Sequence, residues 1–161
     1  MSVISINKAM AHLRVDEDID NDIASKLESA ERIAKEYLNR NFYLDKAALD
    51  LAKEEIPLIL SEAKVQYDHD VDFARTLEGD LIDKFIHTAS LNYDTAIRKA
   101  KMISLGIVVN EAIEIGVLLI LGNLYENRED LKQQTFTNCL EALNGIYTHL
   151  EQIWGLANAS W

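Results

Sequence analysis

The stretch 110–130 constrains the fold of this chain more than any other segment. Asn110 can cap a helix whose first turn carries two glutamates, near the positive end of the helix dipole. The apolar residues that follow recur at helical spacing: Ile113, Val117, Leu118, Ile120, Leu121, Leu124 and Tyr125. From residue 115 to residue 121 only Gly116 interrupts the apolar character, so the predicted helix must be covered on most sides. Its run of about ten apolar residues is well short of the roughly 18 that span a bilayer.

This predicted core helix ends in the polar sequence Tyr125-Glu126-Asn127-Arg128-Glu129-Asp130. One guanidinium stands there among several carboxylates. A solvated helix end with local ion pairs explains the pattern. An Arg128 that joins the helix to a neighbouring subunit explains it equally well, and the sequence alone leaves both interpretations open.

The composition favours a single helical domain. A chain of 161 residues can bury one adequate core, and a single proline with six glycines favours long helices over many turns. A net charge of −11 argues against sequence-independent binding of nucleic acid, which needs a basic face. The lone cysteine, Cys139, fits a reducing cytoplasm, and the first ten residues do not resemble a signal peptide. We therefore expect synthesis in the cytoplasm and no membrane segment.

Two amphipathic helices are predicted before residue 45. The first covers residues 6–13, with the apolar side chains Ile6, Ala9, Met10 and Leu13 on one side. An acidic linker, 15–22, follows and ends in candidate caps; it lacks the central glycine and closing glutamate of a calcium loop. The second helix covers about 20–39 and has an apolar stripe from Ile23 to Leu38.

Residues 45–106 are predicted to form an extended helical insertion before the core helix. Pro57 would break a helix interior, so we expect a helix to restart there with proline in its first turn. Apolar residues recur every three or four positions up to Ile103, with a possible break at Gly79 or at 90–92. Gly106 stands where a helix commonly ends. The two halves of the insertion should pair as a long antiparallel helical hairpin, which gives an all-α fold of a small helical bundle plus hairpin. A last helix is expected after residue 137, with the stripe Leu140, Leu143, Ile146, Tyr147, Leu150, Ile153 and Trp154.

No group of residues in the sequence is typical of an active site. The four histidines fall in different predicted elements, and there is no glycine-rich phosphate loop or paired cysteine motif. The segment 68–72, Asp-His-Asp-Val-Asp, is the best metal-like cluster, but residues two apart do not share a helix face. A metal-dependent hydrolase that uses Asp68, His69, Asp70 and Asp72 is therefore the weakest alternative. We expect no enzymatic activity, no cofactor and no bound metal.

Three stretches resemble the head–tail connector (head-completion adaptor) family of long-tailed bacteriophages. Residues 9–16 read Ala-Met-Ala-His-Leu-Arg-Val-Asp, similar to the family's opening A-x-x-H-L-R-v-D pattern. Residues 36–43 read Glu-Tyr-Leu-Asn-Arg-Asn-Phe-Tyr, where relatives carry an aromatic residue and then a Gly-Arg or Asn-Arg end. Residues 117–129 read Val-Leu-Leu-Ile-Leu-Gly-Asn-Leu-Tyr-Glu-Asn-Arg-Glu, similar to the family's l-L-l-v-g-h-l-Y-e-N-R-E. The order and spacing of the outer two motifs carry most of this resemblance.

The resemblance implies a structural virion protein at the head–tail junction, made in the host cytoplasm. Such proteins form a closed ring of about a dozen copies, a heterologous cyclic assembly. The ring lies beneath the portal protein, extends the DNA channel after packaging, and receives the next connector or a tail-completion protein. DNA would pass through it without sequence-specific binding. The residues expected at the oligomer or portal interface are Arg14, Arg40, Tyr125, Asn127, Arg128 and Glu129.

A different class of function remains open from the sequence. The chain could be an all-helical binding module or a regulatory dimer of antiparallel hairpins, unrelated to virions. The size of the particle in solution distinguishes the two hypotheses, because a connector forms a large ring and a regulatory protein would be a monomer or dimer.

Overall fold

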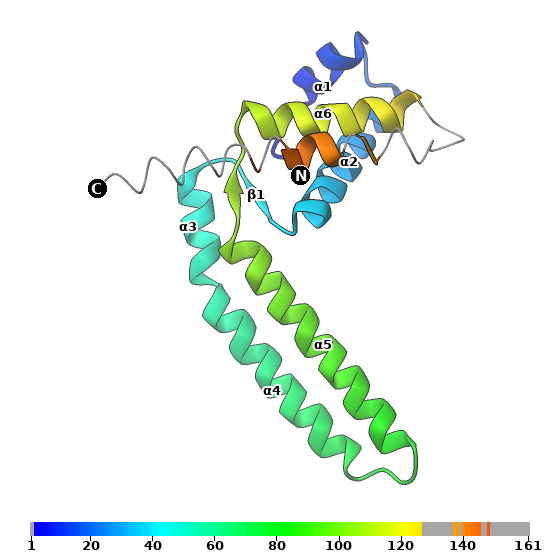
Figure 1. Ribbon diagram of the computed structural model, residues 1–161, viewed down its shortest axis with the longest axis vertical. Coiled ribbons are helices and arrows are strands. Elements are labelled where there is room, and N and C mark those ends of the chain that lie inside the picture. Colours follow the sequence, from blue (N-terminus) through cyan, green and yellow to red (C-terminus); the bar gives the residue numbers. More distant parts are fainter. Residues whose placement is uncertain (1, 127–136, 139, 146–147, 149–161) are drawn as a thin grey trace. The chain divides into compact units, whose positions relative to one another are not determined.

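The computed structural model describes residues 2–126, 137–138, 140–145 and 148. The fold is all-α, as predicted, with two short strands as the only extended elements in this part of the chain (Figure 1). The described residues form two compact units. Unit 1 combines the described residues up to Phe42 with those from Val109 onward, and unit 2 is Tyr43–Val108. Unit 2 covers nearly the same residues as the predicted insertion, 45–106; that the whole chain is one connector domain stays a prediction.

Unit 1 is built around the predicted core helix, α6 (Glu111–Glu126). This helix packs mainly against α2 (Asp22–Leu38) and also contacts α1 (Ile6–Leu13), as Figure 1 shows. The largest side chains that are fully buried in the described residues are Leu27, Ile113, Val117, Ile120, Leu121 and Leu143. Four of these six belong to α6. The continuous apolar run of this helix is therefore the core of the unit.

Asn110 caps α6, as predicted. Its Oδ1 accepts a hydrogen bond from the Ile113 N–H at 3.0 Å, and its carbonyl accepts one from the Glu114 N–H at 2.9 Å. The cap satisfies a backbone donor that a helix start otherwise leaves unpaired. The described part of α6 ends at Glu126, so the predicted extension to residue 130 lies outside the described residues.

The start of α2 differs slightly from the prediction. We expected the helix to begin near Asp20, but Ile19–Asn21 form a separate 3₁₀ turn, η1, and α2 begins at Asp22. Asp20 and Asn21 have φ values of 59° and 57°, in the left-handed region. A right-handed helix cannot continue through that conformation, although aspartate and asparagine tolerate it better than most residues do.

A buried carboxylate on α2 holds the N-terminal segment. Glu31 is only 2% exposed, and its Oε1 accepts hydrogen bonds from the Val3 N–H at 2.9 Å and the Ile4 N–H at 3.0 Å. The Ser2 hydroxyl donates to the same oxygen, and Lys35 Nζ lies 3.3 Å from Oε2. The carboxylate is thus paired on both oxygens, as a buried charge requires.

Unit 2 is a long helical hairpin with a short helix before it. Its helices are α3 (Lys46–Glu54), α4 (Ile56–Ala74) and α5 (Leu81–Ser104). The strands β1 (Phe42–Tyr43) and β2 (Ile107–Val108) pair as a two-stranded sheet. The arms α4 and α5 run side by side and share the most extensive helix–helix contact in the described chain (Figure 1). Two ring contacts mark their register: Tyr67 with Tyr93, with centroids 5.4 Å apart, and Phe73 with Phe85, at 5.7 Å.

In unit 2, proline and glycine lie at the starts and ends of helices, where the sequence predicted them. Pro57 lies in the first turn of α4, where its missing N–H costs no hydrogen bond. The break between the arms falls at Gly79, whose φ of +66° favours glycine, and α5 continues unbroken through residues 90–92. Gly106 follows the end of α5 but serves for close packing: an added Cβ would lie 2.5 Å from Tyr43 Cε2 and 2.8 Å from Leu49 Cδ1.

At Gly116, a neighbouring side chain packs directly on the backbone of α6. An added Cβ would overlap Leu143 Cδ1, whereas a Cβ at Gly122 would meet only His12 Nε2 at 3.6 Å, an ordinary contact. We expect Gly116→Ala to lower the free energy of unfolding by about 1–3 kcal/mol, because extra atoms in a packed core force side chains to shift. Gly122→Ala, on the same helix, is the matched control and should be neutral or stabilising.

Urea unfolding of the two variants measures this difference. Adding Leu143→Ala to Gly116→Ala should cost less than the sum of the single changes, because it removes the overlapping atoms. Equal stability of the Gly116→Ala and Gly122→Ala variants would contradict the packing of Leu143 on α6.

We expect Glu31→Gln to lower the free energy of unfolding by about 1.5–3 kcal/mol, since hydrogen bonds to a charged group are the strong ones. The amide removes the charge and leaves a single acceptor oxygen for several donors. Glu28→Gln, at an exposed position of the same helix, should change stability by no more than about 0.5 kcal/mol. Chemical denaturation compares the two, and equal losses would show that Glu31 does not hold the N-terminal segment.

Candidate functional site

The predicted interface residues fall in three places. Arg14 follows α1 with a left-handed φ of 57° and is exposed. Arg40 follows α2, is half-buried, and donates its backbone N–H to the Lys35 carbonyl at 3.0 Å. Tyr125 lies in the last turn of α6 and is half-buried. The other three, Asn127, Arg128 and Glu129, lie outside the described residues, so their role stays a prediction.

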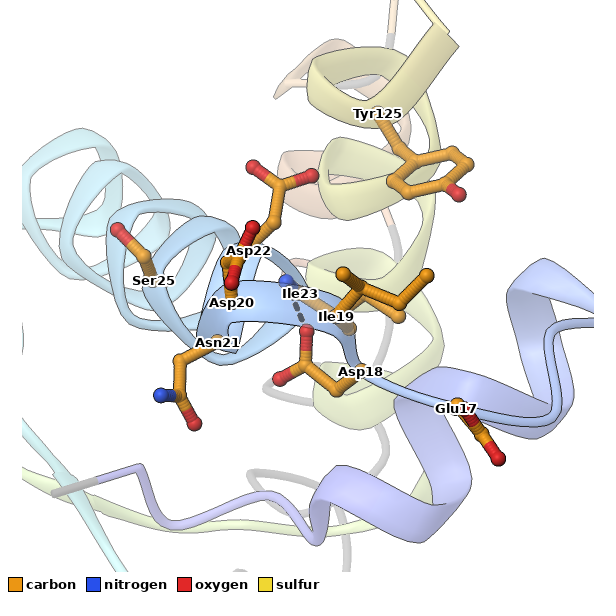
Figure 2. Close-up of a pocket in the computed structure, with 9 residues that line it drawn as sticks. All are labelled: Glu17, Asp18, Ile19, Asp20, Asn21, Asp22, Ile23, Ser25 and Tyr125. Carbon is orange, nitrogen blue, oxygen red and sulfur yellow. Dashed lines mark hydrogen bonds between the residues drawn. The ribbon is translucent and has the colours of Figure 1, made fainter.

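Tyr125 borders a hollow of about 580 Å³ in unit 1. Figure 2 shows the tyrosine reaching from α6 toward the segment that leads into α2. That segment supplies the remaining lining residues: Glu17, Asp18, Ile19, Asp20, Asn21, Asp22, Ile23 and Ser25. Neither Arg14 nor Arg40 lines the hollow. The structure therefore brings one predicted interface residue to an acidic wall and leaves the two arginines elsewhere on unit 1.

The acidic wall has a structural function in the chain itself. Asp18 accepts hydrogen bonds from two N–H groups in the first turn of α2, from Ile23 at 2.7 Å and from Ala24 at 3.0 Å (Figure 2 draws the first). Asp22 pairs with Lys26 one turn further along the helix. The carboxylates at the helix start also lie near the positive end of the α2 dipole. Sequence reasoning assigned this linker caps but did not identify the hollow, since nothing in the linker sequence shows that Tyr125 lies opposite.

The side chains of the metal-like segment 68–72 do not point toward a common site. Asp68 pairs with Lys64, Asp70 accepts from Gln66 Nε2 at 2.7 Å, and Asp72 lies 2.9 Å from Arg75 Nη1. The only contact within the segment joins His69 Nδ1 and Asp70 Oδ1 at 3.5 Å. Among the described residues, no three metal-binding side chains are grouped as an ion would require. The geometry therefore gives no support to the hydrolase alternative.

The ionisation of Lys64 is affected by its surroundings. Its hydrogen bond to Asp68 raises the pKa of the Lys64 ammonium above its ordinary value. Both side chains are exposed, so the pair strengthens a charge that is already present at neutral pH. It therefore behaves as a surface ion pair with no sign of an acid–base function.

In the part of the chain that the structure describes, α6 carries an exposed apolar strip. Ile115 is 53% exposed and Leu119 is 39% exposed, whereas seven of the sixteen residues of the helix are buried. The two are one turn apart and so lie above one another on the same side of the helix. On one flank, Lys8 Nζ of α1 pairs with Glu114 Oε2 at 2.8 Å; on the other, Leu143 covers Gly116. We call Ile115 and Leu119 the α6 strip. The sequence indicated a helix covered on most sides but could not say which side would stay open.

We expect Asp18→Ala to lower the free energy of unfolding by about 1–2 kcal/mol, because two N–H groups of the first turn of α2 lose their acceptor. The control is Glu17→Ala, an exposed carboxylate of the same hollow, which should cost no more than about 0.5 kcal/mol. Thermal unfolding followed by circular dichroism measures both. A loss confined to the Glu17 variant would rule out the capping role.

No helix within the described ranges combines the length and the apolar character needed to cross a membrane. Comparison of the chain with protein-family models, with curated proteins and with solved structures finds no match. The motif resemblance and the geometry of unit 1 are the observations from which a function can be inferred.

Proposed function

We propose that this chain is a structural protein of the head–tail junction of a long-tailed phage and has no catalytic role. In this proposal the copies close into a ring of about a dozen beneath the portal protein. The ring extends the DNA channel and receives the next connector or a tail-completion protein. The protein is then a virion component, present at the point where head and tail join.

The α6 strip is the observation that carries the proposal. A cyclic ring needs a patch on each copy that fits a different patch on the next copy. Ile115 and Leu119 form an apolar patch on the helix that also contains residues 117–126 of the third connector-like stretch. Full burial of such a side chain stabilises an assembly by about 1.5–3 kcal/mol relative to full exposure, so covering both offers a sizeable gain at each interface.

The positions of the other connector-like stretches support the same proposal. The stretch 9–16 spans the second half of α1 and the turn after it, and 36–43 begins at the end of α2. Both helices pack against α6. Three stretches that are far apart in the sequence thus contribute to one compact unit, as expected if they are the signature of one fold.

The charge of the chain fits a DNA channel. At −11 per copy, a ring would present a strongly anionic wall. Phosphates have no dense set of cations to bind on such a wall, so DNA can slide along it without being held. Arg128, in the polar end of the third stretch, is proposed to pair with a carboxylate of a neighbouring copy.

Electron microscopy of the purified full-length chain tests the proposal. We expect rings with rotational symmetry, and we expect Ile115→Asp with Leu119→Asp to reduce the fraction of chain in rings by roughly tenfold or more, since two carboxylates would be buried without partners. Leu58→Asp replaces a side chain of unit 2 that is 59% exposed and is the matched control, with rings expected to persist.

Light scattering on the same samples gives the particle mass. Rings that survive unchanged in the strip variant would contradict the proposed interface. A wild-type particle no larger than a dimer at all concentrations would contradict the ring and favour the alternative of a small regulatory helical protein.

A further inference from the structure

We draw no further inference here: the strongest candidate, the half-exposed apolar face around Phe73 and Phe85 of the α4–α5 hairpin, carries no proposal because nothing in the structure shows what covers it.

Discussion

The burial of α6 is the constraint on which the rest of unit 1 depends. A helix that is apolar on nearly every side cannot face water alone, so its neighbours are determined by what they cover. The long amphipathic α2 covers one side with small and branched residues such as Leu27 and Ala30, α1 covers another, and Leu143 lies directly on the backbone at Gly116. Ile115 and Leu119 are left on the open side. In the proposed ring, a neighbouring copy covers these two side chains.

The excess of negative charge serves two purposes. Some carboxylates are structural: Asp18 and Asp45 accept backbone N–H groups at helix starts, and Glu31 holds the N-terminal segment from inside the unit. In each case the negative charge meets donors that would otherwise lack a partner. Others, such as Asp68 and Asp80, form surface pairs with a lysine one turn away. Such pairs add little stability, and the charge left over is what would make a ring of copies anionic.

Local sequence rules predicted those features that depend on neighbours along the chain. The Asn110 cap, the restart at Pro57, the end of α5 before Gly106 and the pairing of two long arms each follow from periodicity or from one residue's backbone preference. Features that depend on distant residues could not be predicted. In the sequence, Glu31 resembles an ordinary polar residue of a helix surface, and only the folded N-terminal segment buries it. The hollow at η1 is lined in part by Tyr125, which is distant in the sequence. The exposure of the α6 strip also depends on distant residues. The sequence shows that the strip is apolar, but only the packing of the neighbouring helices determines whether it is exposed.

A cryo-electron microscopy map of the assembled particle tests the central claim most directly, because it shows what covers α6. The account predicts that Ile115 and Leu119, exposed in one copy, are buried against a neighbouring copy all around a closed ring. A map in which the α6 strip faces solvent in every copy, with the subunits joined through other surfaces, would contradict it.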